Sequence, residues 1–229
     1  MSAAWSVAGV IAELEAKASA TFRDDMGSRY GIVTNDRTLG VSMANMKALA
    51  KRIGRDHKLA QALWKAGVYE ARIMAVLVDD ADAVTAAQMD RWRRDFDNWS
   101  VTDTACFALF DRSPHAFDMV GKWAKLNDEF GKRAAFALLA CLAIHGRGED
   151  AFFLGGLKLV EAHAGDERNF VKKGVSWALR GIGGKKSPVL RKAAREVAAR
   201  LAASDDKTER WVGKDAMRAF AKPTTRQAG

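Results

Sequence analysis

The sequence predicts an all-α protein built from stacked helix pairs, on three observations. Helix-favouring Ala, Leu, Lys, Arg and Glu are abundant, and the 229 residues include only three prolines. Apolar residues recur at helical spacing along nearly the whole chain, and no segment shows the alternation of a strand. One pattern, with small residues in its first turn and large apolar residues after them, returns about every 30 to 40 residues.

The recurring pattern is typical of HEAT-type repeats, in which each helix pair buries its apolar face against its neighbours. Such stacks curve, so we expect a concave, basic groove suited to an extended ligand. The sequence predicts one repeat domain over 1–220 and a disordered tail over 221–229. The pattern occurs in YEARIMAVLV (69–78), TDTACFALF (102–110), GKRAAFALLA (131–140) and VKKGVSWALR (171–180).

The individual helices are delimited by Gly, Asp, Asn, Ser and Pro residues, which end or begin helices. Gly54 divides two early helices, Asn98 precedes the helix that holds TDTACFALF, and Ser187-Pro188 opens a late helix. We expect helices over 3–19, 42–53, 56–66, 69–79, 85–95, 99–111, 114–125, 128–145, 149–163, 167–182, 188–203 and 206–220.

The charge favours a polyanionic partner, because the net charge is +9 and the pI about 9.7. It is also uneven: Arg168 to Arg200 contains ten Lys or Arg residues and one acid, Glu196. A basic block on folded helices indicates phosphate contacts. The alternative is a solvated surface with a basic bias.

Several functional classes are disfavoured. Cys106 and Cys141 lie in apolar helical stretches, as small core residues of a reducing compartment do. No His, Cys or Glu spacing is typical of a zinc site, and no cofactor is expected. The longest apolar run (136–144) is about half a membrane span, and the N-terminus lacks a basic segment, so we expect a cytoplasmic, nucleoid-associated monomer without a membrane partner.

An acid stands in the centre of an aromatic stripe. Phe96, Trp99, Asp103, Phe107 and Phe110 are spaced 3, 4, 4 and 3 apart, as on one helix face. In one interpretation Asp103 only closes a capping box with Ser100 as N-cap. In the other, the Trp99–Asp103 pair stabilises a positive charge.

The basic segment FVKKGVSWALR (170–180) places cations around Trp177. Lys173 lies one turn before the indole and Arg180 almost one turn after it. Either Trp177 is a core residue with surface cations around it, or this face lies against a nucleic-acid backbone. After it, RGIGGKKS (180–187) predicts a glycine C-cap between two helices, with Lys185 and Lys186 as phosphate contacts. Four other tryptophans are expected to pack in the core: Trp64, Trp92, Trp123 and Trp211.

These segments together resemble a known family. NWSVTD (98–103) resembles the NWD-hydrophobic-V-D segment of the AlkD-type DNA alkylation repair glycosylases, and GKRAA (131–135) resembles their R-A-A helix. FVKKGVSWALR is similar to their segment around a second tryptophan. GVSMANMKALAK (40–51) and LWKAGVYEAR (63–72) are similar to two segments further upstream. The matches follow the family order and cover roughly residues 30 to 200.

The resemblance implies HEAT-like repeats wrapped on duplex DNA and hydrolysis of the N-glycosidic bond of cationic N3- or N7-alkylated purines, such as 3-methyladenine and 7-methylguanine, without a base-flipping pocket. It implies that Asp103 is the catalytic carboxylate and that Trp99 and Trp177 face the lesion's deoxyribose. The implied DNA contacts lie at Arg133 and around the second tryptophan. With the basic residues beside them, the expected DNA-binding set is Arg133, Lys132, Lys172, Lys173, Arg180, Lys185 and Lys186.

This sequence also departs from the family pattern. Ser100 stands where an Asp is usual, Met43-Ala44 replaces the usual proline region, and Gly181 stands where an acid often follows. The Trp–Asp–Trp set is intact. Two alternatives remain open: a non-catalytic HEAT module that binds DNA or RNA through its basic face, and a protein–protein scaffold.

Overall fold

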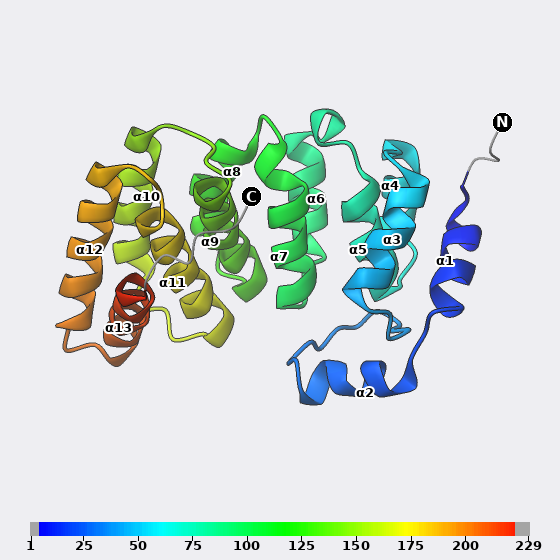
Figure 1. The fold of residues 1–229 in the computed structure, drawn as a ribbon, viewed down its shortest axis with the longest axis horizontal. Coiled ribbons are helices and arrows are strands. Elements are labelled where there is room, and N and C mark those ends of the chain that lie inside the picture. The colour runs from blue at the N-terminus through cyan, green and yellow to red at the C-terminus, as the bar shows by residue number, and fades with distance from the viewer. Residues whose placement is uncertain (1–4, 223–229) are drawn as a thin grey trace. The chain divides into compact units, whose positions relative to one another are not determined.

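The computed structural model describes residues 5–222; residues 1–4 and 223–229 lie outside this part. Apart from an isolated bridge between Arg37 and Val68, the regular structure of residues 5–222 is entirely helical, which confirms the all-α prediction. Figure 1 labels the α-helices, which are α1 (Val7–Glu15), α2 (Ala20–Ser28), α3 (Met43–Ile53), α4 (His57–Trp64), α5 (Tyr69–Val78), α6 (Ala86–Arg94), α7 (Trp99–Ala108), α8 (Ala116–Ala124), α9 (Glu129–Ile144), α10 (Asp150–His163), α11 (Asn169–Gly183), α12 (Pro188–Ala202) and α13 (Lys207–Ala221). Two short 3-10 helices are η1 (Ala81–Ala83) and η2 (Phe110–Arg112).

The sequence missed one helix, α2. The prediction placed a single helix over 3–19, whereas α1 ends at Glu15 and α2 follows from Ala20 to Ser28. Only Met26 of α2 is buried, so the segment has almost no apolar periodicity to read. Ser19 caps it by accepting the Phe22 N–H at 3.2 Å. Of the tail predicted over 221–229, Ala221 ends α13 and residues 223–229 lie outside the described part.

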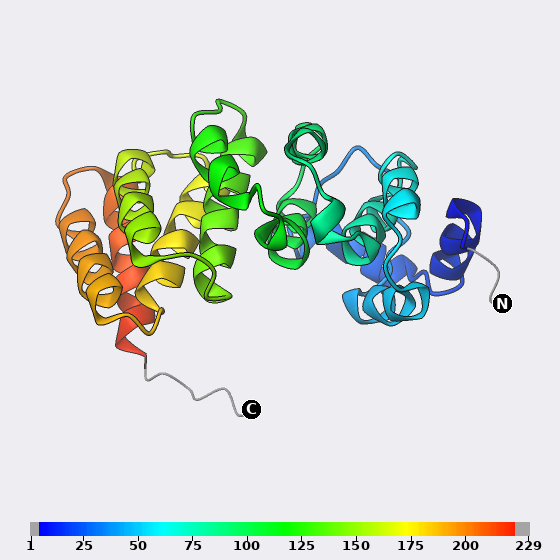
Figure 2. The same cartoon turned by 90° about the horizontal axis from the view of Figure 1, so that it is seen from above.

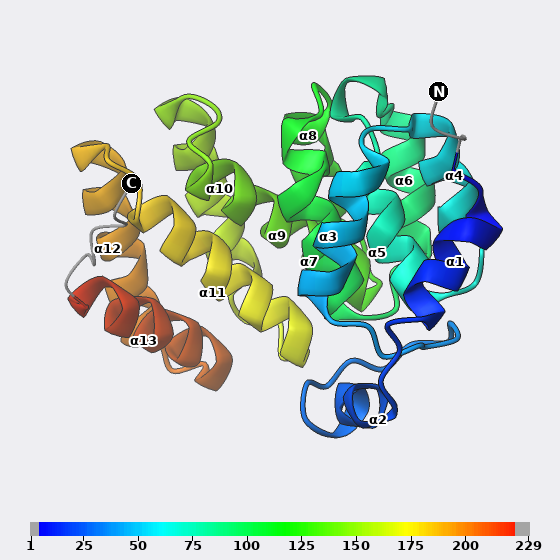
Figure 3. The same cartoon turned by 45° about the vertical axis from the view of Figure 1, so that its right-hand side comes forward.

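The chain divides into two compact units, Met1–Ala116 and Phe117–Gly229, each with its own core. That they act as one repeat domain stays a prediction. In the first unit, α5 packs against α3, α4 and α7 (Figure 3). The core beside α7 is aromatic: the rings of Trp64 and Trp92 stack with centroids 4.0 Å apart, and Phe96 and Phe110 lie against them.

A buried carboxylate fixes the segment that leads into α3. Glu70 of α5 is fully buried and accepts the backbone N–H groups of Leu39, Gly40 and Val41 at 2.8–3.2 Å. Gly40 has a φ of 82°, and a Cβ there would lie 2.8 Å from the backbone nitrogen of Arg23, so only glycine fits. The acid of LWKAGVYEAR therefore has a structural role.

The second unit is organised around α11, which packs against α9, α12 and α13, and Figure 2 shows α12 and α13 lying side by side. Small residues let α11 and α9 approach closely: a Cβ on Gly181 would lie 3.2 Å from the carbonyl oxygen of Ala140. The helix continues through the GIG sequence to Gly183, and Gly184 is its C-cap, as predicted. No helix within residues 5–222 is long and apolar enough to cross a bilayer.

Candidate nucleic-acid interface

The start of α7 tests the capping interpretation of Asp103. The N-cap is Asn98, whose side chain accepts the Val101 N–H at 3.0 Å, and the Thr102 hydroxyl donates to the Asn98 carbonyl at 2.7 Å. The capping box predicted from Ser100 to Asp103 is therefore wrong. The first turn of α7 holds no acid, and Asp103 lies beyond it. Capping does not explain the carboxylate.

The aromatic stripe around Asp103 is shorter than predicted. Phe96 precedes α7 and Phe110 lies in η2, and both are buried in the aromatic core. On α7 itself, Asp103 lies one turn after Trp99 and one turn before Phe107, whose exposed fraction is 46%. Trp99 and Asp103 are half-buried. A half-buried acid thus stands between a half-buried indole and an exposed phenyl ring.

The indole of Trp99 is held by the segment between α2 and α3. Its Nε1–H donates to the carbonyl oxygen of Tyr30 at 3.0 Å. Asp97 fixes the same segment, because its carboxylate accepts from the Thr34 hydroxyl at 2.9 Å and from the Asn35 N–H at 2.7 Å. Residues 30 to 35 therefore orient the indole, although they lie more than 60 residues earlier in the chain. No residue spacing in the sequence predicts this contact.

In the second unit, Trp177 lies half-buried on α11, and Lys173 and Arg180 of the same helix are exposed. Ser176 is fully buried, and its hydroxyl donates to the Asp215 carboxylate at 2.6 Å. Arg180 Nε lies 3.5 Å from the same carboxylate. Burial acts to raise the pKa of Asp215, but the Ser176 hydrogen bond and the charges of Arg180 and Arg218 outweigh it and lower that pKa. Asp215 thus ties α13 to Ser176 and Arg180 of α11, a role that sequence reasoning missed.

Two predicted DNA contacts have partners inside the protein. Arg133 is only 6% exposed; its Nη1 donates to the Phe170 carbonyl at 2.7 Å and its guanidinium lies over the Phe170 ring. The Lys132 side chain is 13% exposed, with its Nζ 3.5 Å from Asp166. These contacts fix the first turn of α11 against α9. Arg133 is thus buried and Lys132 half-buried, and direct contact of either cation with DNA stays a prediction.

The remaining predicted cations differ in their surroundings. Lys172 lies half-buried with its Nζ 5.4 Å from the ring centre of Trp211, which is itself half-exposed instead of in the core. Lys185 lies 4.2 Å from the ring centre of Phe153, whereas Lys186 is exposed. Among residues 5–222, Lys173 and Lys186 form no ion pair. The structure thus places Trp99 and Asp103 in the first unit, and Trp177 and all the predicted DNA-binding cations in the second.

The comparisons with known proteins agree with this architecture. A model of the family described as DNA alkylation repair enzyme matches residues 10–221, nearly the whole chain. The chain belongs to this family. A comparison with curated proteins gives no match.

A solved structure gives the fold of this DNA alkylation repair family member independently. It has a TM-score of 0.76 and 20% sequence identity, and the match covers 93% of this chain and 95% of that chain. That protein is described as one of a new family related to the HEAT-like repeat DNA glycosylases, with affinity for branched DNA structures. The HEAT-like repeat fold predicted from the sequence is confirmed.

Ser100, where this DNA alkylation repair family member departs from the expected Asp, has a defined environment. It is buried, and its hydroxyl lies 2.7 Å from the hydroxyl of Tyr69 on α5. Burial raises the pKa of Tyr69 to about 12, and the hydrogen bond with Ser100 only partly opposes this. Residue 100 therefore joins α7 to α5 below the face that carries Trp99 and Asp103.

Proposed function

We propose that this chain is a DNA glycosylase of base excision repair that hydrolyses the N-glycosidic bond of cationic N3- or N7-alkylated purines, such as 3-methyladenine and 7-methylguanine, in duplex DNA. The observation that carries the proposal is a half-buried acid, Asp103, one turn from the aromatic side chains of Trp99 and Phe107 on a helix whose N-cap is Asn98.

The chemistry needs a negative charge of this kind. Alkylation makes the purine cationic and a good leaving group, and the bond breaks through an oxocarbenium-like sugar. Only interactions that strengthen as positive charge moves onto the sugar accelerate this step. The Asp103 carboxylate supplies such an interaction through Coulomb attraction, and it positions or deprotonates the attacking water. A base that is already cationic needs no closed pocket to activate it.

The tryptophans add to this stabilisation. The face of an indole attracts a cation by about 0.5–2 kcal/mol, depending on how far the pair is desolvated. We propose that Trp99 and Trp177 both contact the lesion's deoxyribose when DNA is bound. The Tyr30 carbonyl fixes the indole of Trp99 through its N–H, so its ring does not need to be ordered at the moment of reaction.

The DNA backbone is proposed to contact the exposed cations of the second unit, Lys173, Arg180 and Lys186. The half-buried Lys172 and Lys185, which lie over aromatic rings, are proposed to assist them. Arg133 and Lys132 are proposed to act indirectly, by fixing the first turn of α11. Neutralising phosphates in this way makes binding strongly dependent on salt.

The test compares the wild type with Asp103→Asn for release of free 7-methylguanine and 3-methyladenine from methylated duplex DNA. Asp118→Asn, an exposed acid on α8, is the matched control. Binding of all three proteins to undamaged duplex is measured in the same salt series. We expect release by the wild type and the control, a loss of about 10²-fold in Asp103→Asn, and equal binding. Salt-dependent binding without release by the wild type would exclude the enzyme.

A second candidate function is a non-catalytic module that binds branched DNA. Two observations favour it: the structurally similar protein is described as having affinity for branched DNA, and Ser100 replaces the acid usual in glycosylases of this fold. This function predicts that a four-way junction binds more tightly than a duplex of equal length, and that Asp103→Asn binds both like the wild type. Base release separates the two candidates.

A further inference from the structure

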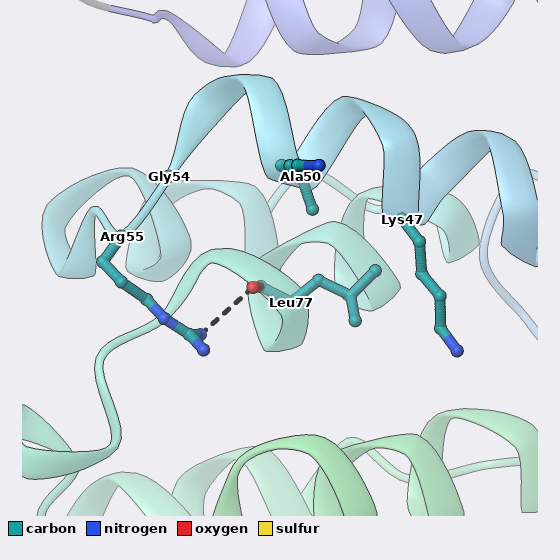
Figure 4. A pocket seen from close by; sticks show the side chains of 6 residues that line it. Lys47, Ala50, Gly54, Arg55 and Leu77 are labelled. Carbon is teal, nitrogen blue, oxygen red and sulfur yellow. Dashed lines mark hydrogen bonds between the residues drawn. The ribbon is translucent and has the colours of Figure 1, made fainter. Parts of the chain in front are cut away.

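A basic hollow lies in the first unit, away from the residues discussed so far. It is formed by the second half of α3, the turn after it and the last turn of α5, and has a volume of about 300 Å³ (Figure 4). Its lining residues are Lys47, Ala50, Lys51, Gly54, Arg55 and Leu77. Three of the six are cations and none is an acid.

The two lysines are not neutralised by neighbouring side chains. Lys47 and Lys51 are one turn apart on α3, both are exposed, and neither forms an ion pair within residues 5–222. The adjacent Arg52 lines a different hollow and pairs with Glu13 of α1 at 2.7 Å. The cations of α3 therefore divide into one that serves packing against α1 and two that face the hollow.

The third cation is held in place by the backbone. Nη1 of Arg55 donates to the carbonyl oxygens of Asp79 at 2.6 Å and Leu77 at 3.2 Å, at the C-terminal end of α5. Its Nη2 and Nε have no partner among residues 5–222. Figure 4 shows Lys47 and Arg55 on opposite sides of Leu77, with the Arg55 guanidinium beside the Leu77 carbonyl oxygen. A fixed guanidinium with spare donors suits a phosphate oxygen.

Asp79, whose carbonyl accepts from Arg55, does not line the hollow. The Asp79 carboxylate is fully buried and accepts from Gln88 at 2.6 Å and from the Asp80 N–H at 2.8 Å, with His57 Nδ1 at 2.6 Å. At Gly54, a Cβ would meet no atom within 4 Å, so this side of the hollow is open to an incoming group. The hollow thus combines three cations, a small apolar floor and access from solvent.

We propose that this hollow binds a phosphate group of a DNA strand, which makes α3 a second DNA contact, in the unit that carries Asp103. The charge and the open side define the ligand as a compact anion, and the net charge of +9 favours a polyanion as its source. DNA as that source rests on the proposed function; the anion site itself does not.

The test is Lys47→Gln combined with Lys51→Gln, measured for binding to undamaged duplex between about 50 and 200 mM salt. Lys58→Gln combined with Lys65→Gln is the matched control, because both lysines are exposed on or beside α4 and outside the hollow. Each lost phosphate contact lowers the salt slope of log K by about 0.9. Because the hollow holds one phosphate, we expect the slope to fall by about 0.9 in the first double variant and to stay unchanged in the control.

A second arm titrates the wild type and both double variants with inorganic phosphate alone and follows the amide signal of Gly54 by NMR. We expect that signal to move in the wild type and the control but not in Lys47→Gln/Lys51→Gln. A phosphate response with an unchanged DNA slope would overturn DNA as the source. Unchanged behaviour in both arms would overturn the site. Because neither readout involves base release, failure of the glycosylase proposal gives a different result.

Discussion

Whether Asp103 belongs to a capping box depends on whether Ser100 or Asn98 is the N-cap of α7. Ser100 and Asp103 have the spacing of a capping box, but Asn98 begins the helix instead, with an extended backbone and a side chain that accepts the Val101 N–H. The predicted capping box has only Ser100 as the N-cap, with Asn98 as a break before the helix, although asparagine and serine cap helices about equally well. The prediction that five residues share one helix face was likewise correct only for the three that lie on α7, Trp99, Asp103 and Phe107.

The position of this cap is testable by itself. Asn98→Ala removes the bond to the Val101 N–H and should lower the free energy of unfolding by about 1 kcal/mol. Asn98→Ser, which retains a capping oxygen, should recover most of that loss. Urea denaturation followed by circular dichroism measures both. Equal stability of Asn98→Ala and the wild type would show that α7 is not capped at this residue.

The ion pair beside Lys132 predicts a pH dependence. The side-chain hydrogen bond from Arg168 lowers the pKa of Asp166 from 3.8, and burial only partly opposes it. Because the folded pKa lies below the unfolded one, the carboxylate stabilises the fold at neutral pH, and this contribution is lost as the pH falls through the folded pKa. Asp166→Asn should therefore lower Tm at pH 7, with a difference from the wild type that shrinks below pH 3.8. Asp205→Asn, an exposed acid, should show no such trend.

At the scale of helices, the spacing of apolar residues was sufficient to predict a helix wherever that helix buries a full face. It failed at α2, which buries only Met26. It also could not reveal contacts between distant elements. Asp215 fixes Arg180 from 35 positions away, and the Arg133 guanidinium bonds the start of α11 instead of facing solvent. Such contacts depend on how helices pack, which local sequence does not encode.

The packing of α13 on α12 gives a prediction at this scale. A Cβ on Gly213 would overlap the backbone nitrogen of Ala202 and lie 2.6 Å from the Ala198 carbonyl oxygen. Gly213→Ala should therefore destabilise the protein by about 1–3 kcal/mol. Gly155→Ala on α10, where a Cβ meets nothing within 4 Å, should instead stabilise it by up to about 1 kcal/mol. Denaturant titration of both variants measures the contrast, and a stabilised Gly213→Ala would refute the close approach.

For the molecule as a whole, the net charge, the repeat period and the order of the motifs predicted the fold class and the family. They could not predict that the proposed catalytic set is divided between two compact units, with Trp99 and Asp103 in one and Trp177 in the other. The account requires both units to act on one lesion. Trp177 and Asp103 should then be coupled in the rate of base release, although they are 74 positions apart.

The most direct measurement is the single-turnover rate of 7-methylguanine release from a duplex with one lesion, for the wild type, Asp103→Asn, Trp177→Leu and the double variant. The account predicts that the wild type far exceeds spontaneous depurination and that each substitution slows it. It also predicts that the two losses are non-additive by at least about 0.5 kcal/mol. A wild-type rate equal to spontaneous release, or strictly additive losses, would contradict it.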